Sequence, residues 1–177
     1  MQLKSAPLPD NESERLAELR RYEILDTPDE DGFDDLTRLA TLVCGAPIAL
    51  VSLVDADRQW FKSRVGLDAR ETPRAVAFCA HAIKGRAVFE VPDAMTDERF
   101  RDNPLVTDAP NVRFYAGAPL IAASGHGMGT LCVIDRIARQ LTAEQHEALT
   151  LLSREVVARM ETRVLNRRLQ ADRKSVV

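Results

Sequence analysis

Residues 77–83 place a cysteine and a histidine two positions apart in an apolar run. Such a pair could act as a nucleophile with its base, or supply two ligands of a metal site. Composition predicts a helix over 75–84 that ends at Gly85, and positions i and i+2 of a helix point about 200° apart. Cys79 and His81 then cannot converge on one atom. The pattern favours a buried thiol and a hydrogen-bonded histidine, one of which can still face a pocket.

Motifs for metal, phosphate or acyl chemistry are missing from the sequence. The three histidines and three cysteines show no CxxC or HxxxH spacing, so no metal site is expected. Convergence of Cys79 with Cys132 on zinc is the alternative, which chelation would test. No Walker, G-x-G-x-x-G or G-x-S-x-G sequence occurs, and SGHGMG at 124–129 is typical of a hairpin turn. The acidic segment 93–111 favours a solvated loop with one helical turn at 97–100 over paired catalytic carboxylates, so no catalytic residue is predicted.

Composition indicates one ordinary globular domain. The 177 residues are 45% hydrophobic and 29% charged, with a net charge of −3. That charge gives no reason to expect nucleic acid, and no apolar run approaches the roughly 20 residues of a membrane span. The N-terminus lacks the apolar segment of a signal peptide, and an odd number of widely spaced cysteines fits a reducing compartment. A cytoplasmic protein without membrane contact is therefore expected.

Two helices are predicted ahead of the first strand. Residues 1–10 are expected to form a flexible tail, followed by a helix over about 12–24 with a capping residue just before it. The charged residues expected to face water on this helix are Arg15, Glu18, Arg20 and Arg21. A second helix is expected to begin near Thr27 or Asp29 and to end at Gly45. Its apolar stripe consists of Phe33, Leu36, Leu39, Ala40 and Val43.

The period of the apolar residues then changes to that of strands. Residues 47–55 are apolar on both alternating faces, as in a central strand that is covered on both sides. Residues 59–65 follow after a short polar turn, which predicts an antiparallel hairpin. This second strand is expected to be half exposed, because one of its faces carries long charged side chains. The two faces are Trp60, Lys62 and Arg64 on one side and Phe61, Ser63 and Val65 on the other.

Shorter patterns predict the remaining strands and a long last helix. Residues 87–91, 112–123 and 130–135 are expected to be strands. Thr142 opens a helix that continues to the end of the chain, since no Gly or Pro follows it. Its apolar residues step by three or four positions, as in a helix–helix seam: Leu149, Leu152, Val156, Met160 and Val164.

The order of these elements predicts the α+β class, with a central antiparallel sheet of about five to six strands. Tight hairpins at 56–58 and 124–129 exclude a doubly wound nucleotide-binding fold, which needs crossover helices between parallel strands.

Four stretches, in this order and spacing, closely resemble a bacterial GAF domain. They are LVSLVDADRQWFKSRVGL, FCAHAI, VRFYAGAPL and MGTLCVID, and the resemblance runs from about Leu19 to Leu152. The similarity is to the class found at the N-terminus of sensor histidine kinases and diguanylate cyclases. The preceding RYEILDTPDEDGFDDLTRLA is similar to the first helices of that class.

The resemblance implies different roles for two parts of the chain. Residues 11–153 would form the GAF domain, with terminal helices on one face of the sheet and a small-molecule pocket under the short helix and loops on the other. Residues 154–177 would continue the last helix as a signalling and dimerisation segment. The implied partners are a second copy, bound through the N- and C-terminal helices, and an output domain such as a histidine kinase or diguanylate cyclase.

A pocket would be lined by residues of the sheet and the short helix. Arg113, Tyr115 and Gly117 share one face of 112–123 and combine polar groups with little bulk, although a partly solvated sheet face explains them nearly as well. The family binds cyclic nucleotides, haem or bilins. The cyclic-nucleotide signature cannot be traced here and Cys79-Ala80-His81 is a poor match to the bilin anchor, so the cofactor is left unknown. The candidate pocket residues are Trp60, Phe61, Phe78, Cys79, His81, Asp93, Arg113, Tyr115, Gly117, Thr130 and Cys132.

These features favour a sensory module without enzymatic activity that binds an unidentified small molecule. Two alternatives stay open. One is a thiol-based reductase of the same fold, of the methionine sulfoxide type, which would use Cys79 and Cys132. The other is a ligand-free dimerisation module, which predicts a sealed core in place of the pocket.

Overall fold

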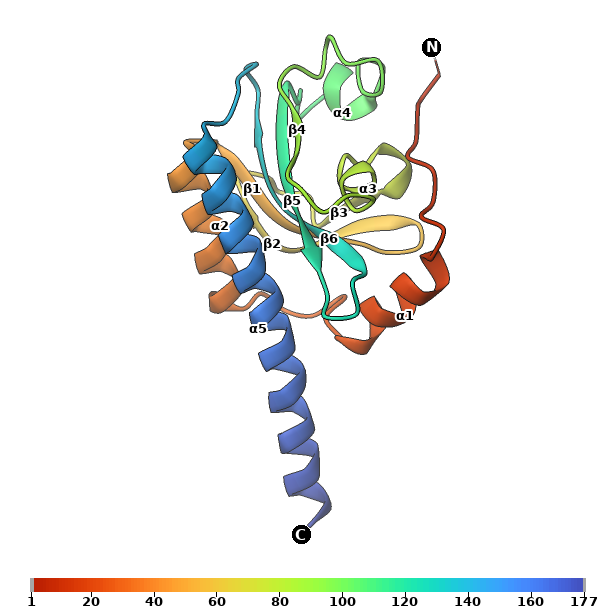
Figure 1. Ribbon diagram of the computed structural model, residues 1–177, viewed down its shortest axis with the longest axis vertical. Coiled ribbons are helices and arrows are strands. Elements are labelled where there is room, and N and C mark those ends of the chain that lie inside the picture. Colours follow the sequence, from red (N-terminus) through yellow and green to blue (C-terminus); the bar gives the residue numbers. More distant parts are fainter. Residues whose placement is uncertain (1, 177) are drawn as a thin grey trace.

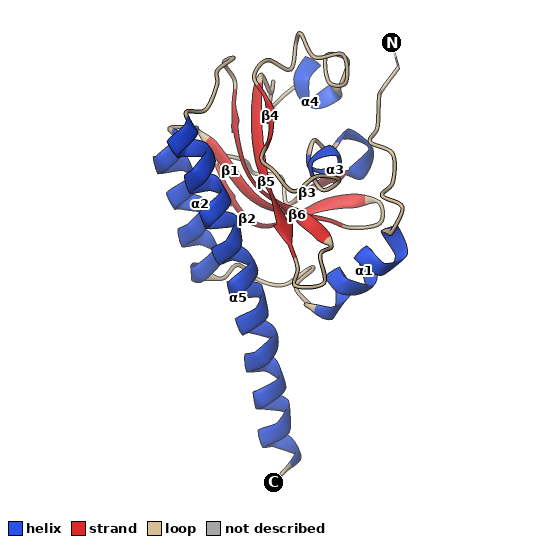
Figure 2. Cartoon of the chain, viewed as in Figure 1, coloured by secondary structure: helices blue, strands red, loops and turns tan. Residues whose placement is uncertain are grey.

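A six-stranded antiparallel sheet forms the centre of the structure, a computed structural model that describes residues 2–176 (Figure 2). The strands are β1 (Ile48–Val54), β2 (Arg58–Val65), β3 (Glu71–Pro73), β4 (Phe89–Val91), β5 (Phe114–Ile121) and β6 (Gly127–Asp135). Their spatial order is β3-β2-β1-β6-β5-β4, and every neighbouring pair is antiparallel. The predicted α+β class and sheet are confirmed.

The long helices and the short ones lie on opposite faces of this sheet (Figure 1). Helix α2 (Asp31–Cys44) covers β1 and β2, and α5 (Ala143–Ser175) covers β5 and β6, while α1 (Glu12–Arg21) packs near β6. The other face carries the 3₁₀ turn η1 (Arg74–Val76), α3 (Cys79–Ala82), α4 (Pro104–Thr107) and their loops. We call the two apolar layers the helix-side core and the loop-side core.

Strand β1 is buried along its whole length, as its apolar run predicts. Its alternate residues divide between the two cores: Ala49, Val51 and Leu53 face the helices, whereas Ile48 and Leu50 face the loops. The same alternation divides β5, where Phe114, Ala116 and Ala118 face the helices and Tyr115 faces the loops. The predicted assignment of faces on this strand is confirmed.

The predicted water-facing surface of α1 is wrong at Arg15, of which only 1% is exposed. Arg15 shares a helix face with Glu12 and Leu19, and that face points inward. Its guanidinium donates to both oxygens of Glu12, at 2.9 and 3.0 Å. The buried Arg74 donates to the same carboxylate, so the Glu12 charge balances two buried cations.

Helix α2 begins later than predicted and buries a narrower stripe. Thr27 does not cap it, because the Thr27 hydroxyl donates to the Ile24 carbonyl and accepts from Lys62. Gly45 ends the helix as predicted, with a left-handed φ of 61°. Leu39 and Val43 are 44% and 42% exposed, because α2 packs against the sheet and α5 along one side only.

The helix predicted over 75–84 is interrupted. Residues 74–76 form a 3₁₀ turn, Ala77 is extended, and α3 then covers four residues. The loop at 93–111 has hydrogen bonds of one turn from Phe100 and Arg101 to the Asp97 carbonyl, as predicted near 97–100. Its regular helix is α4, however, which Asn103 caps by accepting from the Leu105 amide. The sequence Asn103-Pro104 is typical of a helix start, with a capping residue followed by proline at the first position, and marks the beginning of α4.

Helix α5 begins with the capping box that Thr142 and Gln145 predict. The Thr142 hydroxyl accepts from the Gln145 amide at 3.2 Å, and the Gln145 side chain accepts from the Thr142 amide at 2.9 Å. Four residues of the predicted seam are fully or nearly buried, and Leu152 is half-buried. The buried four are Leu149, Val156, Met160 and Val164.

We expect Thr142→Ala to lower the free energy of unfolding by about 1 kcal/mol, the usual cost of losing an N-cap. Urea denaturation would measure it. Thr162→Ala is the matched control, since its exposed hydroxyl bonds only to the Ala158 carbonyl of the same helix. An equal loss in both variants would contradict a specific capping role.

Candidate functional site

A buried polar cluster joins α3 to the centre of the sheet. It consists of Cys79, Tyr115, Thr130 and Cys132, and we call it the thiol–phenol cluster. The Tyr115 hydroxyl donates to Cys79 Sγ at 3.2 Å, and Thr130 Oγ1 lies 3.1 Å from Cys79 Sγ and 3.3 Å from the Tyr115 oxygen. Cys132 lies two positions from Thr130 on β6 and belongs to the same loop-side core. Each of the four side chains is at most 2% exposed.

The pairing of β5 with β6 explains why these side chains lie close together. Thr130 and Cys132 are two positions apart on β6 and therefore share a face, and Gly117 of β5 is paired with Cys132. Gly117 leaves room for the Tyr115 ring, because a Cβ at position 117 would lie 2.3 Å from the Tyr115 oxygen. The phenol hydroxyl consequently reaches the position above β6 where the two thiols meet.

Gly117→Ala should therefore displace the Tyr115 ring and lower the free energy of unfolding by about 2 kcal/mol, the usual cost of overpacking a core. Urea denaturation would measure the loss. Gly85→Ala serves as the control, because its Cβ would meet no atom closer than 3.9 Å. If Gly117→Ala behaved like this control, the ring would not be confined as described.

The pKa values of the groups in the cluster are shifted in opposite directions. Burial raises the pKa of Cys79, but hydrogen bonds from Cys132, Ser52, Thr130 and Tyr115 outweigh that effect and lower it. Burial and the neighbouring Cys79 raise the pKa of Cys132, and burial likewise raises the pKa of Tyr115. The Tyr115 hydroxyl donates to Cys79 Sγ and so favours the charged form of that thiol.

Aromatic rings fill the space between the cluster and the loops. Phe78 stacks on Phe100 with ring centroids 4.0 Å apart and packs against Tyr115 at 5.2 Å. The half-buried His81 meets the edge of Phe100 at 4.8 Å, and burial lowers the pKa of this histidine. As their spacing predicts, Cys79 and His81 contact different groups.

The other candidate residues lie apart from the cluster. Phe61 belongs to the loop-side core, whereas Trp60 lies in the helix-side core on the opposite face of the sheet. Asp93 accepts from the Met95 amide in a local turn. Arg113 donates to the carbonyls of Val106 and Val112, and so its guanidinium holds the loop near α4.

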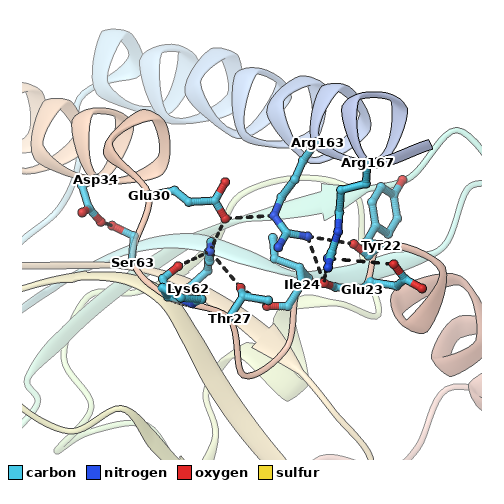
Figure 3. A network of polar contacts seen from close by, with 11 residues as sticks. Tyr22, Glu23, Ile24, Thr27, Glu30, Asp34, Lys62, Ser63, Arg163 and Arg167 are labelled. Atoms are coloured by element: carbon cyan, nitrogen blue, oxygen red, sulfur yellow. Dashed lines mark hydrogen bonds and ion pairs between the residues drawn. The ribbon is translucent and has the colours of Figure 1, made fainter. Parts of the chain in front are cut away.

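A second polar region, which the sequence did not indicate, joins β2 to helix α5 (Figure 3). Its centre is Lys62, whose side chain is fully buried. The ammonium group donates to Thr27 Oγ1 at 2.9 Å, to the Pro28 carbonyl at 2.6 Å and to Glu30 Oε2 at 2.5 Å. Arg163 of α5 donates to the same Glu30 oxygen at 2.9 Å. We call this region the helix junction.

A β-bulge directs Lys62 into the junction. Val51 pairs with Ser63 and Ser52 pairs with Phe61, so Lys62 is the extra residue of β2. Lys62 and Ser63 both point towards α2 and the segment before it, where Ser63 donates to Asp34 at 2.6 Å. The predicted alternation and half exposure of β2 are therefore wrong at this place. No signal in the sequence marked the bulge.

Helix α5 also holds the segment between α1 and α2. Arg163 donates to the carbonyls of Tyr22 and Glu23, and Arg167 donates to the Glu23 carbonyl at 2.8 Å. Glu23 and Asp26 have positive φ values of 48° and 61°, which non-glycine residues adopt only when the surroundings impose them. The segment is thus fixed by the sheet on one side and by α5 on the other.

Charge pairing holds the junction together. Burial would raise the pKa of Glu30, but its bonds with Lys62 and Arg163 lower it. The Glu30 carboxylate is therefore ionised at neutral pH and links the sheet to the helix.

A groove of about 540 Å³ lies beside the junction, between the start of α2 and the side of α5 that carries Arg159, Arg163 and Arg167.

Within residues 2–176, no three His, Cys, Asp or Glu side chains gather in an arrangement that could hold a metal ion. No helix in the same range combines the length and apolarity needed to cross a bilayer.

The fold and its two polar regions define a single α+β domain in which long helices cover one face of an antiparallel sheet and short elements close the other. The chain belongs to the GAF family, whose model, described as "GAF domain", matches residues 28–164.

Comparisons with individual proteins agree with this assignment. A cyclic di-GMP phosphodiesterase of Pseudomonas aeruginosa is 46% identical over 161 residues, which is 90% of this chain. The chain spans only 27% of the length of that relative. The GAF domain of an Acinetobacter phosphoenolpyruvate-protein phosphotransferase has a TM-score of 0.63 at 14% identity, covering 88% of this chain and 95% of that domain.

A free methionine-R-sulfoxide reductase of Thermoplasma acidophilum also shares the fold. Its TM-score is 0.61 at 10% identity, with 75% of this chain and 92% of the reductase covered. At such low identity the likeness concerns the fold alone.

Proposed function

We propose that this chain is a sensory GAF domain that regulates an output domain or partner protein through helix α5. The chain itself has a regulatory and not a catalytic role, and kinase, cyclase or phosphodiesterase activity resides in the output domain. Within the family, we assign the chain to the domains that precede histidine kinases and cyclic di-GMP enzymes. Its location is cytoplasmic. The relative from Pseudomonas aeruginosa supports this choice of output.

The course of α5 is the observation that carries the proposal. Its first half packs on the sheet through Leu149, Val156 and Met160, and its second half projects beyond the domain (Figure 1). At the point of departure, Arg163 and Arg167 tie the helix to the junction. A shift at the sheet or in the segment 22–30 would therefore move a rigid rod that leaves the domain.

Dimerisation through the long helices is part of the proposal. Exposed apolar side chains that support it occur on α2 (Leu39, Leu42 and Val43) and on α5 (Leu151, Leu165 and Leu169). Sedimentation at high micromolar concentration should show a dimer, which Leu42→Glu weakens and Ile137→Glu, an exposed control outside both helices, does not. A protein that stays monomeric throughout would contradict this part.

A chimaera tests the regulatory role. In it, this chain replaces the matching segment of the Pseudomonas aeruginosa phosphodiesterase, and cyclic di-GMP hydrolysis is the readout. We expect the chimaera to be active and Arg163→Ala, which loosens the junction, to change its activity at least threefold, with Arg168→Ala as the exposed control. Identical activity for the chimaera, the variant and a phosphodiesterase lacking the segment would overturn the proposal.

The packed loop-side core favours a second version, in which the module relays without a small molecule. Phe78, Phe100 and Tyr115 occupy the region where the pocket was expected. Native and denaturing mass spectra of the purified protein, with an absorbance scan, separate the two versions. A mass difference that vanishes on denaturation, or visible absorbance, favours a ligand, and a bare protein mass favours the ligand-free module.

A further inference from the structure

Two of the three cysteines lie side by side in the loop-side core, on elements that are distant in the sequence. Cys79 begins α3, and Cys132 is in the middle of the central strand β6. Thr130, which lies 3.1 Å from Cys79 Sγ, shares a face of β6 with Cys132, and both cysteines belong to the loop-side core. Neither the regulatory proposal nor the fold requires two thiols at this place.

The surroundings of Cys79 are those of an activated thiol. A thiolate reacts with oxidants far faster than a thiol, and hydrogen-bond donors that favour the charged form promote it. Tyr115 donates to Cys79 Sγ at 3.2 Å, and the Thr130 hydroxyl lies at 3.1 Å. Cys44 provides the contrast within the same chain: it is buried in the helix-side core, and burial raises the pKa of its thiol.

We propose that Cys79 and Cys132 are a redox-active pair, which hydroperoxides oxidise to a disulfide between α3 and β6. In the first step Cys79 thiolate attacks a peroxide oxygen, the O–O bond breaks, and Cys79 sulfenic acid forms with release of water or alcohol. In the second step the Cys132 sulfur attacks Cys79 Sγ, the S–O bond breaks, and water leaves as the disulfide forms. A low-molecular-weight thiol reverses the change. The pair thus loses two protons and two electrons to one peroxide.

Cys79 is only 2% exposed, so a small oxidant can reach it only by local opening of the segment that contains α3. Helix α3 has only four residues, and the extended Ala77 separates it from η1. The N-terminal tail contributes a hydrogen bond from Ser5 to the Ala75 carbonyl over this segment. Opening of such a short element costs less free energy than unfolding of the whole domain. The disulfide would then fix α3 on the sheet.

Peptide mapping under non-reducing conditions tests the inference on the intact chain. Native protein treated with hydrogen peroxide should yield a cross-linked Cys79–Cys132 peptide that a thiol reductant removes. Cys44→Ser should give the same product. Cys132→Ser should instead accumulate a Cys79 sulfenic acid that dimedone traps, and Tyr115→Phe should slow oxidation severalfold, because Cys79 loses the hydroxyl that donates to its sulfur.

Three results would overturn the inference. The first is a native wild-type protein whose Cys79 and Cys132 stay reduced under peroxide while the urea-unfolded chain is oxidised. The second is a product that pairs Cys44 with either thiol, and the third is a Cys79 oxidation rate equal to that of Cys44. Circular dichroism of each variant before treatment establishes that it is folded, and the wild-type map decides the question even if a variant is not.

Discussion

We expect Glu12→Gln to lower the free energy of unfolding by about 3 kcal/mol, because it breaks a buried ionic contact. The Glu12 carboxylate accepts hydrogen bonds from Arg15 and Arg74, which are 1% and 8% exposed. Glutamine keeps the volume but removes the charge, so two buried guanidinium groups lose their counter-ion. Urea denaturation at neutral pH measures the loss.

Glu14→Gln is the control for this substitution, because Glu14 is an exposed residue of the same helix. It should change the free energy of unfolding by less than about 0.5 kcal/mol. If Glu12→Gln also changed the free energy of unfolding by less than about 0.5 kcal/mol, water and not Glu12 would compensate the charges of Arg15 and Arg74.

The dependence on pH gives an independent reading of the same contact. Burial raises the pKa of Glu12, but hydrogen bonds with Arg15 and Arg74 outweigh burial and lower it from 4.5 to about 2. A lowered pKa stabilises the folded state fully above the unfolded value, so this contribution is lost as pH falls from about 4.5 to 2. The difference in stability between wild type and Glu12→Gln should therefore shrink by about 2 kcal/mol over that range, allowing for screening at the exposed edge.

Much of the fold was predictable because apolar periodicity records which faces are buried. The run 47–55 indicated a strand covered on both sides, and the alternation in 112–123 assigned its faces correctly. Thr142 and Gln145 marked the start of α5. Errors arose where local geometry departs from the regular period, as at the bulge of β2 and at the break before α3.

The site was predictable only in part, for a different reason. The candidates Cys79, Tyr115, Thr130 and Cys132 do meet, but their meeting depends on the pairing of β5 with β6 and on the space above Gly117. Register and ring packing are tertiary properties that no single stretch encodes. Spacing within 77–83 could therefore separate Cys79 from His81, but could not place Cys79 beside Cys132.

Two of the three buried cations, Arg15 and Lys62, were expected at the surface, and both join the N-terminal segment to the body of the domain. Arg15 contacts Glu12 and the Gly127 carbonyl at the end of β6, and Lys62 holds the segment that leads into α2. Long charged side chains are assigned to water by default because burial without partners is costly. Here the partners come from distant elements. The N-terminal segment is consequently attached by ionic contacts that a shift in geometry can weaken.

The second large effect is expected at the helix junction, where Lys62→Met should lower the free energy of unfolding by about 2 kcal/mol. Methionine fills a similar volume, so no cavity term is added. Thr27, Pro28 and Glu30 lose their common donor. In Lys62→Met, Glu30 still pairs with Arg163 and its side chain is 40% exposed to water. The expected loss is therefore smaller than the loss from breaking an ion pair that is fully buried.

Two measurements separate this contact from a general effect of losing a lysine. Urea denaturation of Lys84→Met, at an exposed position, should show almost no change. Amide hydrogen exchange should rise in the segment 22–30 of Lys62→Met, because its clamp between β2 and α5 is lost. A Lys62→Met protein more stable than wild type would mean that the cost of burying the ammonium exceeds its gain from three acceptors. The junction would then hold α5 in place at the expense of stability, as expected of a contact kept for regulation.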